Sequence, residues 1–319
     1  MRYSKLGGQA VIEGVMMKNQ EKYAVAVRKP DHEIEVKVSE YTGIIKNKKI
    51  RNMPILRGVF SFIESLVLGM QTLTYSASFF EDEEVDEKKK EPMTEEERRR
   101  QEQKEKKQEN AMMGGTVVLS IVLAVAVFMM LPYYLSTLFQ KVITSQWVIA
   151  LLEGVIRLVI FIGYVALISL MKDIRRVYMY HGAEHKCINC IEHGLSLTVE
   201  NVRKSSKEHK RCGTSFMLFV MIVGIVLLFF VRVESPLMRV IVRIALLPVI
   251  AGISYELIKW AGSSENPVVC ILSKPGLWLQ GLTTKEPDDE MIEVGIAAVE
   301  AVFDWKAYLR ENFGYKEEE

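Results

Sequence analysis

The chain has 319 residues, a formal net charge of +1, and a composition in which 49% of the residues are apolar and 25% are charged. Because the charge is nearly balanced, nothing in the composition supports a nucleic-acid partner, and we expect none. Apolar and charged residues are separated into blocks along the chain, which is typical of a membrane protein with soluble parts. Residues 1–18 lack an apolar run long enough for a signal peptide, so we expect insertion to rely on internal segments.

Short strands are expected before the first apolar block. Residues 9–18, 23–28 and 33–41 have the alternating or continuous apolar positions of strands, and the turn residues at 29–32 predict a hairpin. We therefore expect a small sheet within a strand-rich segment, residues 1–53.

The next two segments differ sharply in composition. Residues 54–80 are apolar but contain Arg57 and Glu64, which suits a helix that lies in the membrane interface or re-enters the membrane. Residues 81–110 are almost all charged and have no apolar stripe to bury, so they predict a linker that is disordered or forms a solvated helix.

Four longer apolar runs each approach the roughly 20 residues that a helix needs to cross a bilayer. They are residues 114–139, 142–171, 213–231 and 240–260. They predict two transmembrane hairpins, at 111–171 and 213–260, joined by a loop at 172–212. Lysine and arginine are plentiful before the first run and within this loop, whereas the short hairpin turns carry few. The positive-inside rule therefore predicts a multi-pass protein with both termini and the loop in the cytoplasm.

Ionisable residues within membrane spans are functional candidates by default. Those found here are Glu153, Arg157, Arg243 and Glu256. Glu153 and Arg157 lie one helical turn apart, so we expect them to neutralise one another. Four spans also leave little room for a transport path.

The C-terminal segment, residues 261–319, begins with a stretch punctuated by proline and glycine. Its continuation at 291–309 has an apolar periodicity that predicts an amphipathic helix, which we expect to pack on the N-terminal strands or the central loop. The predicted fold is a membrane α-helical protein with four transmembrane helices. A small cytoplasmic α+β domain combines the N-terminal strands, the central loop and the C-terminal helix.

The central loop holds four of the five histidines and three of the four cysteines. His181, Glu184 and His185 form an H-x-x-E-H pattern, which places the three side chains on one face of a helix. Two neutral imidazoles bind zinc or another divalent transition metal, a third ligand comes from elsewhere, and the carboxylate takes a proton from the attacking water. This pattern predicts a catalytic metal site.

A second spacing competes with the first. Cys187-x2-Cys190 and His209-x2-Cys212 have the arrangement of a four-ligand structural zinc site, which would only hold the loop together. Spacing alone favours neither kind of site.

Four motifs carry a resemblance to a known family: YHGAEHK, HKRCGTSF, GGQAVIEGVMMK near the start and PGLWLQGLTTKEP near the end. In this order they resemble the YqhQ-like family of bacterial membrane proteins, which is of unknown function and labelled as predicted metal-dependent enzymes. The resemblance implies a bacterial cytoplasmic membrane and the following site positions: Glu13, His181, Glu184, His185, Glu192, His209, Arg211 and Cys212. It does not require Cys187 or Cys190, which counts against the four-ligand site.

Together these patterns predict a metal-dependent hydrolase at the cytoplasmic membrane face, acting on a lipid-linked or membrane-delivered substrate. We expect His181, His185 and either His209 or Cys212 to bind the metal, with Glu184 as the general base.

Two further charged residues have expected roles at this site. Arg211 would hold an anionic group of the substrate, and Glu13 would approach the metal as a ligand or as an acceptor behind a ligand. The alternatives from other classes are a non-enzymatic membrane scaffold or assembly factor with a structural zinc site, and a small transporter.

Overall fold

The computed structural model describes residues 2–43, 53–80, 114–231, 235–264 and 266–316, together with positions 104, 111 and 233. The linker predicted for residues 81–110 therefore lies outside the described residues, apart from Lys104. The chain divides into two compact units. The first comprises Met1–Phe80, Ile162–Val231 and Val242–Glu319, and the second comprises Glu81–Phe161 and Arg232–Ile241.

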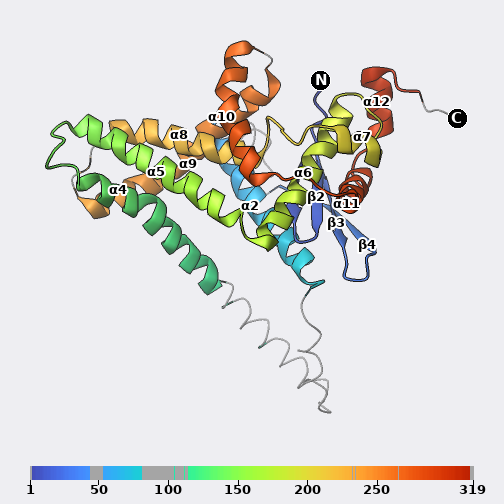
Figure 1. The fold of residues 1–319 in the computed structure, drawn as a ribbon, viewed down its shortest axis with the longest axis horizontal. Helices are drawn as coiled ribbons and strands as arrows, with labels where there is room; N and C mark the ends of the chain where they lie inside the picture. The colour runs from blue at the N-terminus through green and yellow to red at the C-terminus, as the bar shows by residue number, and fades with distance from the viewer. Residues whose placement is uncertain are drawn as a thin grey trace. The chain divides into compact units, whose positions relative to one another are not determined.

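The N-terminal strands of the first unit form one antiparallel sheet in the order β1-β2-β3-β4 (Figure 1). The strands are β1 (Gly7–Val11), β2 (Gly14–Asn19), β3 (Lys22–Arg28) and β4 (Ile34–Glu40). The predicted sheet is thus confirmed, but the single strand expected at 9–18 is two strands. Glu13 adopts a left-handed backbone with φ of 48°, which turns the chain tightly between β1 and β2.

Four helices in the described part of the chain are long and apolar enough to cross a membrane, which confirms the four predicted runs at this level. They are Gly114–Thr137, Gln146–Ile168 (α5), Gly213–Phe230 (α8) and Val240–Gly262, the last within α9 (Pro236–Ser263).

The first of these helices contains a π-helical turn, η3 (Ala126–Met130), followed by α4 (Leu131–Thr137). Pro132 lies in the first turn of α4 and cannot donate to the carbonyl of Phe128 four residues earlier. Arg157 of α5 instead donates from Nε to that carbonyl at 3.1 Å, and its Nη2 lies 2.6 Å from Glu153. The expected Glu153–Arg157 pair therefore forms, and Arg157 also donates to a carbonyl of the π-helical turn.

The remaining helices belong to the first unit and are α2 (Leu56–Ala77), α6 (Lys172–Glu192), α7 (Val199–Lys204), α10 (Pro267–Thr283), α11 (Asp289–Glu300) and α12 (Trp305–Phe313). Helix α10 was not predicted, because Pro275 lies inside it; Pro267, by contrast, suits the first turn, where its missing N–H is not needed. The amphipathic helix expected at 291–309 is divided between α11 and α12. Asp304 caps α12 by accepting from the backbone N–H of Ala307.

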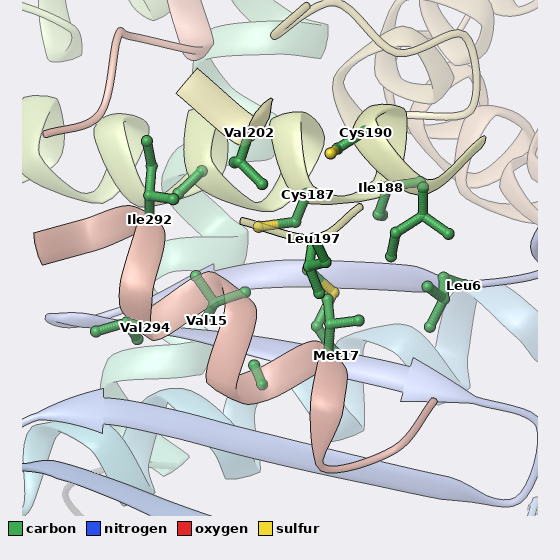
Figure 2. Packing of buried hydrophobic residues seen from close by; sticks show 14 of the residues in the cluster. Leu6, Val15, Met17, Cys187, Ile188, Cys190, Leu197, Val202, Ile292 and Val294 are labelled. Atoms are coloured by element: carbon green, nitrogen blue, oxygen red, sulfur yellow. The ribbon is translucent and has the colours of Figure 1, made fainter. Parts of the chain in front are cut away.

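The core of the first unit lies between the sheet, α6 and α11 (Figures 1 and 2). Val15 and Met17 of β2, Ile188 of α6, and Ile292 and Val294 of α11 are all buried there. The three segments that were expected to form an α+β domain therefore share one apolar core. This core fixes the position of α6, which carries the H-x-x-E-H pattern.

Candidate metal centre

Helix α6 holds His181 and His185 one turn apart, with ring centroids separated by 4.4 Å. The Nδ1 atom of His181 lies 2.9 Å from the main-chain oxygen of Thr283, and that of His185 lies 2.6 Å from the oxygen of Lys207. A ring nitrogen that faces a carbonyl carries the proton, so in the neutral imidazole Nε2 keeps its lone pair. Both Nε2 atoms are thereby suited to bind a metal.

Cys212 completes this group from the N-cap of α8. Its Sγ lies 3.3 Å from Nε2 of His181 and accepts from the backbone N–H of Thr214 at 3.3 Å. One ligand atom from each of His181, His185 and Cys212 lies within 4.8 Å of the other two. Two imidazole nitrogens and a thiolate form a donor set that zinc and other divalent transition metals accept, so these residues fit the expected metal.

The same three residues are electrostatically coupled. Burial raises the pKa of the Cys212 thiol, but the adjacent imidazoles of His181 and His185 lower it well below its ordinary value. Burial lowers the pKa of His181, but the Cys212 thiolate and Glu184 outweigh it and raise that pKa to about 9. Without a metal, the thiolate therefore lies beside a protonated imidazole, and a metal ion must displace that proton.

Glu184 faces the same two nitrogens from within α6. Its Oε2 lies 3.8 Å from Nε2 of His181 and 3.9 Å from Nε2 of His185, and the side chain is buried. Gly8 of β1 makes this placement possible, because a Cβ there would lie 2.6 Å from Cγ of Glu184. Sequence reasoning missed Gly8, although it belongs to the GGQAVIEG motif.

Helix α10 supports the centre from the other side. Gln280, which is fully buried, accepts from the backbone N–H of His209 at 2.9 Å and donates to its carbonyl at 2.8 Å. It also donates to the hydroxyl of Ser215 at 2.8 Å. Gln280 thus ties the segment before Cys212 to the first turn of α8. The conspicuous PGLWLQGLTTKEP motif was the available signal for this role.

His209 lies beside the centre but does not join it. Its ring centroid is 5.6 Å from that of His185, yet its Nε2 lies 3.0 Å from Nη2 of Arg211 and 3.8 Å from Oε2 of Glu192. Of the two alternatives for the third ligand, the geometry brings in Cys212 and directs His209 elsewhere.

Arg211 is engaged by protein groups and not directed at a substrate position. Its Nη2 donates to Oε1 of Glu192 at 2.5 Å, and its guanidinium lies 4.0 Å above the ring of Tyr3. The backbone N–H and hydroxyl of Ser4 donate to the same oxygen at 2.9 and 2.8 Å. Burial raises the pKa of Glu192, but His209, Arg211 and Ser4 lower it to about 2. The arrangement ties the N-terminus to the segment that carries Cys212.

Glu13, which was expected to approach the metal, is held by two residues of α6. Its carboxylate forms an ion pair with Arg176 and accepts from the hydroxyl of Tyr180 at 3.2 Å. Glu13 therefore connects the β1–β2 turn to α6. One of its two partners, Tyr180, directly precedes His181 in the chain.

Cys187 and Cys190 do not approach the three ligands. Both point from α6 into the apolar core, where Figure 2 shows them among residues such as Leu197 and Val202. Cys190 Sγ lies 3.4 Å from the carbonyl of Ser196. Burial raises the pKa of Cys187, and it raises that of Cys190 to about 11. Both are therefore protonated thiols, and the four-ligand finger is not formed.

Comparison with known proteins places the chain in a family. Residues 53–305 match the family described as "Protein of unknown function (DUF1385)". The chain is 36% identical over 307 residues to "Uncharacterized protein YqhQ" of Bacillus subtilis (strain 168), which covers 96% of this chain and 94% of that protein. No solved structure matches the chain. Neither description contains an activity or a metal. The matches cover most of the chain in both cases, so the chain belongs to the DUF1385 family and the resemblance to YqhQ-like proteins is confirmed.

Proposed function

We propose that the chain is a membrane-anchored, metal-dependent hydrolase with a centre built from His181, His185 and Cys212. The observation that carries this proposal is the convergence of three ligand atoms within 4.8 Å. The histidines are also oriented for binding, because main-chain carbonyls hold both Nδ1 atoms. Such hydrogen bonds are typical of metal-binding imidazoles.

Three protein ligands leave one position of a tetrahedral metal open, which is the pattern of catalytic sites. A divalent metal bound here would supply Lewis-acid activation of the attacking water and of the substrate. Glu184 lies within 3.9 Å of both Nε2 atoms, so its carboxylate would take the proton from that water and pass it to the leaving group. His181 and His185 hold their orientation throughout, because Thr283 and Lys207 fix the opposite side of each ring.

The position of the centre in the chain supports a substrate at the membrane. Helix α6 begins four residues after α5 ends, and Cys212 directly precedes α8. Both halves of the centre are thus attached to helices that can cross a membrane. We infer a lipid-linked or membrane-delivered substrate at the cytoplasmic face of a bacterial membrane, with both termini on that side, as the distribution of lysine and arginine favours.

The structure changes the proposed role of one residue. Arg211 already pairs with the buried Glu192, so it serves to position the His209–Cys212 segment. An anionic substrate group would then need a different partner.

The rival proposals differ in their observable consequences. In a scaffold with a structural zinc site, Glu184 would become the fourth ligand and close the centre. In a transporter, Glu153 and Arg157 would carry charge, but each already pairs with the other. The pairing of Glu153 with Arg157 therefore counts against the transporter, whereas the scaffold differs from the hydrolase in whether Glu184 is a ligand.

Cobalt(II) substitution of the purified protein tests the proposal. An open centre predicts that acetohydroxamate, a small metal-binding anion, shifts the visible absorption bands of the cobalt protein. It also predicts that Glu184→Gln leaves the bands of the unliganded protein unchanged, because Glu184 is not a ligand. Bands that resist acetohydroxamate and change with Glu184→Gln would show a closed, four-ligand centre and contradict the hydrolase.

A further inference from the structure

Helix α10 buries several polar side chains and exposes several large apolar ones. Four of its large exposed side chains are apolar and between 54% and 62% accessible, and they lie beside the exposed Lys274: Val268, Ile271, Leu272 and Trp278. Its buried residues include the polar Ser273, Gln280 and Thr283. A soluble helix shows the reverse arrangement.

Helix α2 has the same inverted arrangement. It exposes Ile63, Leu66, Val67, Met70 and Leu73, each more than a third accessible. It buries Glu64, Thr72 and Ser76. Two helices outside the four membrane-crossing candidates therefore expose several large apolar side chains each, α2 beside Ser65, Gln71 and Thr74 and α10 beside Lys274.

Such faces are unfavourable in water and favourable against hydrocarbon. Exposed apolar surface costs free energy in proportion to its area in water, whereas lipid tails are as apolar as these side chains. A buried glutamate and buried hydroxyls inside a protein, with leucine and isoleucine outside, are what a lipid environment requires.

Both helices pack directly on helices that can cross a membrane. On α10, a Cβ at Gly276 would lie 2.7 Å from the hydroxyl of Ser215 in α8, and Thr283 lies 3.1 Å from Thr214. Small residues at this contact let the two helices approach closely. The outward face of α10 is therefore continuous with the surface of α8.

Helix α2 contacts α8 and α9 in the same way. The rings of Phe62 and Phe216 are 5.5 Å apart, and a Cβ at Gly58 would lie 2.6 Å from Cβ of Tyr255 in α9. Arg57 forms an ion pair with Glu256 at this contact. A bilayer that surrounds α8 and α9 would thus extend over α2.

We propose that α2 and α10 are embedded in the same bilayer as α8 and α9, with their exposed apolar faces against lipid acyl chains. At 17 residues and about 25 Å, α10 is shorter than the roughly 30 Å hydrocarbon core, so it enters the bilayer without crossing it. The occupant of these faces is lipid, and the proposal is independent of any metal at the centre.

Tryptophan fluorescence in reconstituted vesicles tests this proposal. In a variant that keeps only Trp278, with Trp147, Trp260 and Trp305 replaced by Phe, phosphatidylcholine brominated on its acyl chains should strongly quench the emission. Aqueous iodide should have little effect. The matched control keeps only Trp305, which is buried in α12 outside the proposed lipid-facing surface and should resist brominated lipid.

Two further variants test α2 and the otherwise native protein. Leu66→Trp in the tryptophan-free chain should show the same lipid quenching for α2, whereas Phe313→Trp, at an exposed position of α12, should respond to iodide. In the otherwise native protein, Trp278→Phe should reduce the fraction of emission that brominated lipid quenches. If Trp278 or a tryptophan at position 66 responds to iodide or to neither quencher, water or protein covers that face and the proposal is wrong.

Discussion

Cys212 Sγ lies 3.3 Å from Nε2 of His181 across 31 residues of sequence. One atom belongs to the middle of α6 and the other to the N-cap of α8, so the contact depends on how the segment between these helices is held. Gln280 and the Glu192–Arg211 pair do this from outside the ligand set. The centre therefore depends on buried polar groups that bind no metal, and several predictions concern them.

Gly8→Ala should displace the side chain of Glu184, because the added Cβ would lie 2.6 Å from its Cγ. We expect destabilisation of about 1–3 kcal/mol, with metal content retained, since the proposed centre does not use Glu184 as a ligand. Thermal unfolding and metal analysis measure both effects. Gly7→Ala is the matched control, because nothing lies within 4 Å of a Cβ there. Equal stability of the two variants would show that β1 does not confine Glu184.

Gln280→Ala should leave buried groups of His209 and Ser215 without their partner. Such groups cost about 1–3 kcal/mol, and loss of an outer support weakens metal binding about 10- to 100-fold. Chelator competition measures the affinity. Lys274→Ala, at an exposed position of the same helix, should change neither quantity. Unchanged affinity in Gln280→Ala would mean that Cys212 is held without this residue.

Glu192 should make stability depend on pH in the acid range. Its pKa is lowered to about 2 in the folded protein, from an ordinary value of 4.5. The stabilisation by ionised Glu192 is therefore complete above about pH 4.5 and is lost as the pH falls toward 2. Thermal unfolding should show a large gap between wild type and Glu192→Gln at neutral pH that narrows on acidification.

The exposed Glu200 provides the control for this experiment. Its pKa is also lowered, by its pairing with Lys204, but at the surface such a pair contributes little to stability. Glu200→Gln should therefore track the wild type at every pH. A gap for Glu192→Gln that stays constant with pH would contradict the assigned charge state.

Cys187→Ser should destabilise the core without affecting the metal. The fully buried thiol lies against α11, where a Cβ at Gly295 would be 3.0 Å from Sγ. The hydroxyl of a serine at position 187 would be buried among apolar side chains. A cost of about 1–3 kcal/mol is expected from unfolding measurements. Cys187→Ala, which adds no polar group, is the control and should destabilise the protein less than Cys187→Ser.

Features set by local sequence were predictable. The four apolar helices follow from the length of each run, and the sheet follows from strand periodicity and turn residues. The shared face of His181, Glu184 and His185 follows from helical spacing alone. The orientation of Cys187 could be predicted in the same way. In a helix that continues past His185, Cys187 lies about 200° around the axis from His185 and therefore faces the core.

Features set by distant contacts were not predictable. The spacing of His209 and Cys212 brings both near the centre, but Gln280 and Glu192 decide which side chain turns inward. Helix α10 has an internal proline, Pro275, and exposes large apolar side chains, so neither periodicity nor composition separated it from a loop. The role of Gly8 can be recognised only once the position of Glu184, 176 residues later in the chain, is known.

The metal content of the detergent-purified protein tests the central claim most directly. The account predicts one zinc or other divalent transition metal per chain in the wild type, its loss in His181→Ala and Cys212→Ala, and its retention in Cys187→Ala. A wild type without metal, or loss only in the Cys187 variant, would contradict the three-ligand centre.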